Sequence, residues 1–212
     1  GGFAVVPVMG SAATYLPGKF GGLAGRALVA GDLLAADERA AGVAARATAS
    51  MLPRDRRPPY GNPAEVRVIF GPHDDYFADE ARATLLAGTY RVSGQSDRMG
   101  LRLSGPGLAR REGRELVSCG TVLGAIQVPV DGRPIVLLAD RQTSGGYPVI
   151  ATVIRADIPL LAQCLPGQTE VRFRAVTVTE AQAALRALAR AWQPIDRDAD
   201  LLGSVADIPN SG

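Results

Sequence analysis

Histidine and lysine are almost absent from this chain of 212 residues, and each scarcity excludes a kind of chemistry. His73 is the single histidine, so the chain cannot supply a zinc site built on several histidines. A Ser-His-Asp triad would have to use His73, and no G-x-S-x-G elbow accompanies it. Lys19 is the single lysine, and Phe20 stands where a Walker A motif needs a hydroxyl. The sequence therefore predicts no metal site and no P-loop.

Cysteine and long apolar runs are scarce too. Cys119 and Cys164 lie far apart and lack the spacing of a metal or redox motif, which favours reduced side chains in a cytoplasmic protein. No apolar run reaches the length of a membrane span. The formal net charge is only +2, which gives little attraction to nucleic acid. We therefore expect a cytoplasmic protein that contacts neither membranes nor nucleic acid.

Short β-branched runs separated by turns are the main pattern that is present. They predict strands at 65–70, 101–104, 124–129, 134–139, 149–155 and 170–178. Helices are expected at 77–86, capped by a preceding Asp, at 160–164 after Asp157, and at 179–192 with Thr179 as the cap. Many short strands with few helices predict a mainly β fold, a barrel or a sandwich.

Composition divides the chain into three regions. Residues 1–37 hold two apolar pieces around a glycine-rich stretch, which predicts strand, loop and strand at the end of an N-terminal subdomain. Residues 38–63 are rich in Ala, Arg and Pro and indicate a surface linker. Residues 64–212 contain the expected strands and helices and form the β domain.

The polar loop 140–148 joins two expected strands and concentrates candidate binding groups. It contains Asp140, Arg141, Gln142, Thr143, Ser144, Gly145, Gly146, Tyr147 and Pro148. Adjacent glycines permit positive φ and close approach of a ligand to backbone N–H groups. Tyr147 offers a ring and a hydroxyl, or forms a rigid and even cis turn with Pro148. The same residues also fit a connection whose polar groups satisfy one another, whereas binding groups favour loops held by a scaffold.

Three further positions are candidates. Gln127 lies within an apolar strand, where its amide must find a backbone or ligand partner. Asp97 adjoins Arg98 in a turn and can hold that guanidinium ready for a substrate carboxylate; the alternative is a structural ion pair. His73 precedes an expected helix, where a structural role is favoured over acid–base catalysis.

Several motifs in a fixed order resemble one family. They are 10–16, 71–75, 96–100, 124–129, 131–132, 140–143 and 145–148. Together they are similar to the 5-oxoprolinase C-subunit family, also known as the KipA or allophanate hydrolase subunit 2 group, which is related to half of the carboxyltransferase domain of urea carboxylase. The family has an additional N-terminal segment before the Gly1 position, and it tends to have a basic residue where Ala12 and Ala13 stand here.

The resemblance implies a cyclophilin-like β-barrel and an ATP-dependent activity that opens 5-oxoproline (pyroglutamate) to glutamate. It implies two partners: one like the B-subunit, of the KipI or allophanate hydrolase subunit 1 kind, and one like the A-subunit. Site roles follow as expectations. Arg98 or Arg141 would bind the substrate carboxylate, and Asp140 would orient Arg141. Gln127 and Gln142 would bind the amide, and Thr143 with the N–H groups of Gly145 and Gly146 would bind phosphate or an oxyanion.

Two other functions stay open. The first is a carboxyltransferase component, in which the same loop binds urea or another amide and meets carboxybiotin; this chain has no Met-Lys-Met biotinylation site. The second is a KipA-type regulatory binding protein that antagonises a kinase inhibitor, which would need a docking face and no turnover.

Overall fold

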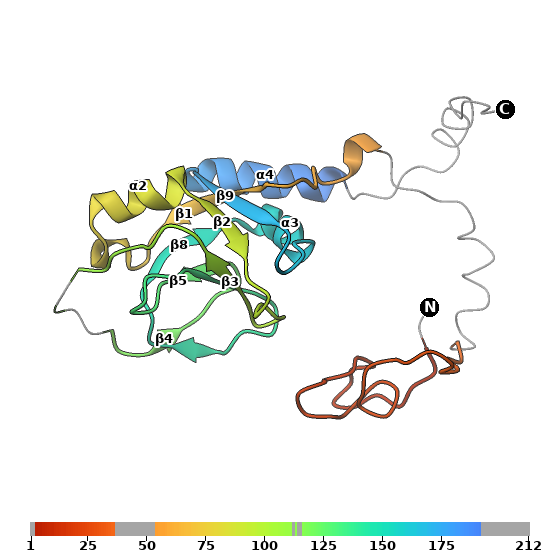
Figure 1. Ribbon diagram of the computed structural model, residues 1–212. Helices are drawn as coiled ribbons and strands as arrows, with labels where there is room; N and C mark the ends of the chain where they lie inside the picture. The colour runs from red at the N-terminus through yellow and green to blue at the C-terminus, as the bar shows by residue number, and fades with distance from the viewer. Residues whose placement is uncertain (1–2, 37–53, 112, 114–115, 192–212) are drawn as a thin grey trace. The chain divides into compact units, whose positions relative to one another are not determined.

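The computed structural model describes residues 3–36, 54–111, 113 and 116–191 (Figure 1). The chain divides into two units, residues 1–54 and 55–212, which we describe separately. Most of the expected linker 38–63 lies outside the described residues, as does the end of the last expected helix at Trp192.

The first unit is built from turns. Its described residues contain isolated bridges and no strand, so the prediction of strand, loop and strand for 1–37 was wrong. The bridges join Phe3 to Ala36, Val8 to Ser11 and Tyr15 to Phe20. Glycines divide the apolar pieces, and several residues around them have positive φ, which interrupts a ladder. The pattern of apolar residues alone did not reveal this interruption.

The second unit is a closed β-barrel, so the prediction of a mainly β fold with a barrel is confirmed. Its strands are β1 (Ala64–Phe70), β2 (Thr89–Val92), β3 (Gly100–Ser104), β5 (Ala125–Gln127), β6 (Ile135–Leu137), β8 (Val149–Val153) and β9 (Glu170–Ala175). They follow the order β1-β8-β5-β6-β3-β2-β9 around the barrel. Neighbours are antiparallel except β1 and β9, whose parallel pairing, with Val66 opposite Phe173, closes the barrel.

Two structural features of this unit were not predicted. Strand β2 follows a helix almost directly and is only four residues long, which is too short for alternation to stand out. Strands β4 (Cys119–Gly120) and β7 (Ser144–Gly145) form a separate two-stranded sheet, with Cys119 paired to Gly145. Strand β7 lies inside the polar loop 140–148, so that loop is partly ordered by pairing.

Alternating side chains of the strands fill the barrel. Val66 and Val68 of β1 and Phe173 of β9 are buried, while Glu65 points outward. The rings of Tyr90 and Phe173 lie 5.7 Å apart in this core. Each such side chain contributes about 1.5–3 kcal/mol on burial, so the barrel is held mainly by its interior.

Three α-helices are described, at α2 (Asp79–Ala87), α3 (Ile158–Ala162) and α4 (Val178–Ala191). All three were predicted, with starts shifted by one or two residues. Short 3₁₀ turns are η2 (Arg54–Arg56), η3 (Asp74–Tyr76) and η4 (Arg155–Asp157). None of the helices in the described part of the chain is long and apolar enough to cross a membrane.

The predicted caps were wrong. Ala78 precedes α2, and Asp74 lies in η3 and pairs with Arg82 at 3.0 Å. Helix α4 begins after Thr177 rather than at Thr179. Thr177 Oγ1 accepts from the Glu180 N–H at 3.2 Å, and Glu180 Oε2 accepts from the Thr177 N–H at 2.7 Å. This reciprocal capping box satisfies backbone donors at the start of the helix.

Asp157 does not cap α3 either, because its carboxylate is used elsewhere. It accepts the backbone N–H of Arg67 at 2.7 Å and binds that guanidinium through Nε at 2.9 Å and Nη2 at 2.6 Å. The carboxylate thereby ties η4 to strand β1.

Candidate functional site

Two glutamine amides meet at the end of strand β5. Gln127 is the last residue of β5 and is only 2% exposed. Gln142 Nε2, from the loop that follows β6, donates to Gln127 Oε1 at 3.3 Å. The structure brings these two predicted side chains together, and we call them the amide pair. Each amide keeps further donor or acceptor capacity that one mutual bond leaves unused.

Backbone bonds hold the loop over the amide pair. The Thr121 N–H donates to Thr143 O at 3.0 Å, and Thr121 Oγ1 donates to the Gln142 carbonyl. The pairing of β4 with β7 fixes the loop a few residues further on. The sequence analysis did not predict a role for Thr121. The only indication was that a hydroxyl residue stands shortly before the strand that carries Gln127. The position of Gln142 therefore depends on Thr121.

Glycine fits position 145 because a side chain there would be crowded, and not because the backbone φ angle is positive. Neither Gly145 nor Gly146 has a positive φ, so that expectation was wrong. A Cβ on Gly145 would lie 2.9 Å from Gln127 Nε2 and 3.3 Å from Gln142 Nε2, which is closer than side chains normally approach. A Cβ on Gly146 would lie 3.4 Å from Ser118 Oγ, an ordinary contact. The chain backbone at Gly145 thus passes directly against the amide pair.

Arg141 carries an unsatisfied donor. Its Nε is buried and has no hydrogen-bond partner among the described residues. A buried N–H without an acceptor costs about 1–3 kcal/mol, so this group is suited to an acceptor supplied by a ligand. The neighbour expected to orient Arg141 is engaged elsewhere.

That neighbour, Asp140, binds Arg98. Asp140 Oδ2 lies 3.0 Å from Arg98 Nε, and Oδ1 accepts from Nη2 at 3.1 Å. Asp97 instead accepts the backbone N–H groups of Met99 at 2.8 Å and Gly100 at 3.2 Å. Both predicted partnerships, Asp97 with Arg98 and Asp140 with Arg141, were therefore wrong. Arg98 is held beside the polar loop by a residue distant in sequence.

The remaining predicted residues lie further outward. Thr143 and Gly146 are exposed, and Tyr147 is 46% exposed. Tyr147 lines a separate cavity of about 330 Å³ with residues of β3 and of the segment before β6. The peptide bond before Pro148 is not among the cis bonds of the structure. Tyr147 is therefore not brought to the amide pair.

His73 is structural, as the sequence favoured. The imidazole Nδ1 of His73 accepts the backbone N–H of Val149 at 3.2 Å, and the backbone N–H of His73 donates to the Val149 carbonyl at 3.1 Å. The ring packs edge-on against Tyr76, with centroids 5.7 Å apart. His73 thus fixes the start of β8, directly after the polar loop.

Comparison with known proteins gives the family. Residues 1–175 match the model of the carboxyltransferase domain, subdomain A and B. The chain is 41% identical over 169 residues to the 5-oxoprolinase C-subunit of Escherichia coli, covering 79% of this chain and 52% of that protein. It is 35% identical over 181 residues to the 5-oxoprolinase C-subunit of Haemophilus influenzae, covering 85% of this chain and 55% of that protein.

The chain therefore spans about half the length of these relatives. A crystal structure of the K. lactis urea amidolyase superposes with a TM-score of 0.72 at 23% identity, covering 93% of this chain and 13% of that one, which shows a shared fold. The likeness to the 5-oxoprolinase C-subunit that the ordered motifs indicated is confirmed by the two relatives. By the match of residues 1–175, this chain belongs to the carboxyltransferase domain family of subdomains A and B.

Proposed function

We propose that this chain forms part of a subunit of an ATP-dependent 5-oxoprolinase that opens 5-oxoproline to glutamate. The observation that carries the proposal is the identity of 41% and 35% to two proteins named as the C-subunit of 5-oxoprolinase. The name of those relatives implies other subunits, and we include partners like the B-subunit and the A-subunit here.

The amide pair fits one half of this substrate. A lactam presents one N–H donor and one carbonyl acceptor side by side. A carboxamide presents the complementary acceptor and donor, and Gln127 and Gln142 supply two of them at the end of β5. Burial of Gln127 excludes competing water, which strengthens such bonds. In this assignment, Gln127 and Gln142 bind the lactam amide.

The arginines fit the substrate carboxylate. Arg141 Nε is a buried donor without an acceptor among the described residues, and we assign it to the carboxylate or to the lactam oxygen. Arg98, held by Asp140, supplies a second guanidinium at the same loop. Charge-assisted bonds of this kind are stronger than neutral ones, so both would orient the substrate. Asp140 is then a positioning residue for Arg98.

A lactam is a poor electrophile, and bound ATP would supply the activation of its oxygen. Charge that develops on that oxygen needs preorganised donors. We assign this role, or binding of the ATP phosphates, to Thr143 and to the backbone N–H groups near Gly145 and Gly146. Tyr147 is assigned to an outer contact with the substrate.

The test is ATP-dependent glutamate release from 5-oxoproline by the mixed partner proteins, measured with and without the protein that contains this chain. Arg141→Gln and Gln142→Leu should each lower kcat/KM by about tenfold or more, the loss expected for one charged or buried hydrogen bond. Arg172→Gln, an exposed arginine on β9, is the control and should leave the rate unchanged. Release that persists when this protein is left out would contradict the proposal.

A second candidate is carboxyl transfer, favoured by the family description itself. The amide pair would then bind urea or a related amide, and carboxybiotin would come from a partner. Bicarbonate-dependent carboxylation of an amide by the complex, in place of glutamate release, would select this function.

A further inference from the structure

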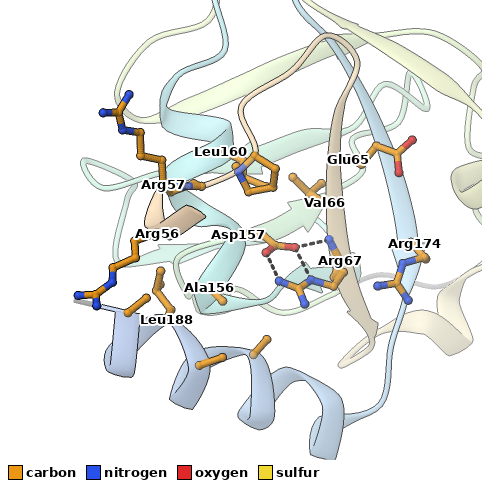
Figure 2. Close-up of a pocket in the computed structure, with 15 residues that line it drawn as sticks. Arg56, Arg57, Glu65, Val66, Arg67, Ala156, Asp157, Leu160, Arg174 and Leu188 are labelled. Carbon is orange, nitrogen blue, oxygen red and sulfur yellow. Dashed lines mark hydrogen bonds and ion pairs between the residues drawn. The ribbon is translucent and has the colours of Figure 1, made fainter. Parts of the chain in front are cut away.

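A second cavity lies under helix α4, away from the amide pair. Its volume is about 520 Å³, within the range of ligand sites. Strands β1 and β9, turn η4, helix α3 and the segment before β1 form its other walls (Figure 2). It shares no lining residue with the amide pair. Helix α4 begins after residue 175, where the family match ends.

Small side chains on α4 create this cavity. The helix presents Ala184, Ala187, Leu188 and Ala191 to it, at the spacing of one helical face. An alanine side chain ends at Cβ, so these positions leave space between helix and barrel. No residue of α4 is buried. Leu160 and Pro58 provide further apolar surface, whereas the Val66 side chain points into the barrel core. One part of the cavity is therefore apolar.

The other part is cationic. Four arginines and two carboxylates line the cavity. Arg56 and Arg57 have other interactions, which leaves Arg67 and Arg174 as its candidate anion-binding groups. Asp157 neutralises Arg67 and holds its guanidinium through Nε and Nη2, while Nη1 has no hydrogen-bond partner in the described part of the chain. Arg174 of β9 extends in the direction of Arg67 (Figure 2) and forms no hydrogen bond with another described residue, and its charge also acts on the carboxylate of Glu180.

This combination points to one class of ligand. A fixed guanidinium edge at Arg67 and a second guanidinium at Arg174 suit a carboxylate, sulfonate or phosphate group. The alanine face suits an apolar body attached to that group. We propose that the cavity under α4 is a binding site for a small amphiphilic anion, with its acidic group at Arg67 and Arg174 and its apolar part against α4.

The probe is anilinonaphthalenesulfonate, and the matched neutral probe is N-phenylnaphthylamine, which has the same apolar rings without the sulfonate. Fluorescence titration of the purified protein should show one saturable site that binds the anionic probe about fivefold more tightly, the upper end for an exposed charge contact. Arg174→Gln should remove that advantage and leave the neutral probe unchanged. Ala184→Leu, which fills the cavity, should weaken both probes.

Two controls match these variants. Arg172→Gln removes the same charge from the same strand outside the cavity, and Ala183→Leu adds the same side chain to an exposed position of α4. Neither should change binding of either probe. Circular dichroism would verify the fold, because partly unfolded protein also binds such dyes. Absence of a saturable site, equal binding of both probes, or equal effects of Arg174→Gln and Arg172→Gln would overturn the proposal.

Discussion

The backbone of Gly145 lies against the side-chain amide of Gln127 so closely that a Cβ there would come within 2.9 Å of Nε2. The relationship couples the polar loop to strand β5 and leads to a first prediction. Gly145→Ala should separate the amide pair and destabilise the fold by about 1–3 kcal/mol, the usual cost of overpacking. Glutamate release should fall with it, and urea denaturation measures the stability change.

Gly146→Ala provides the matched control, because its Cβ would make only ordinary contacts. It should change stability by less than about 1 kcal/mol. Equal effects of the two substitutions would mean that the loop does not rest on the amide pair.

A second prediction concerns the ion pair of Arg67 and Asp157. The Asp157 side chain is 3% exposed and that of Arg67 is 34% exposed. Asp157→Asn should cost about 2–4 kcal/mol, somewhat less than for a fully buried pair, because solvent reaches the guanidinium. Glu170→Gln, which breaks the exposed pair with Arg91, should cost less than about 1 kcal/mol. Similar losses in urea denaturation for both variants would contradict the structural role of Asp157.

A third prediction concerns the start of α4. Thr177→Ala removes the capping box and should destabilise the helix by about 0.5–2 kcal/mol. Since no α4 residue is buried, the loss should appear as faster hydrogen exchange in the first turns of this helix. Thr177→Ser should retain protection. Thr179→Ala should have little effect, and a larger effect there than at Thr177 would place the cap where the sequence first suggested it.

A fourth prediction is a titration in the first unit. Hydrogen bonds from the Arg26 guanidinium, and then from the Val29 N–H, lower the pKa of Asp32 to about 2. Because the folded pKa lies below the ordinary value of about 3.9, the stabilisation is present above about pH 4 and is lost as pH falls toward about 2. Carboxyl NMR should give a midpoint near 2. Arg26→Gln should raise it, and an unchanged midpoint in that variant would exclude Arg26 as the cause.

The pattern of apolar residues predicted the strands of the barrel in two ways. It predicted 65–70 by alternation, since Val66 and Val68 face the core and their neighbours do not. It predicted 149–155 from a continuous apolar run, which is buried on both faces of the sheet. It failed in residues 3–36, where apolar residues occur without a strand partner. Strand counting could not choose between barrel and sandwich, because closure depends on the pairing of β1 with β9, which leaves no local pattern.

The sequence predicted which side chains need a partner better than it predicted which residue supplies that partner. An amide in an apolar strand needs a partner, and Gln127 found one in Gln142. Adjacency of Asp97 and Arg98 was misleading, because a short carboxylate in a turn satisfies the N–H groups that follow it. Arg98 instead pairs with Asp140, which only the fold brings near.

The parallel contact between β1 and β9 also has a consequence for biosynthesis. These strands come from opposite ends of the domain's sequence, and β9 lies between β1 and β2 in the barrel. Until β9 has emerged from the ribosome, both β1 and β2 present unpaired edges, which are prone to aggregation. Closure of the barrel must therefore follow translation of β9, and a nascent chain stopped before Glu170 would leave the edges of β1 and β2 open to aggregation.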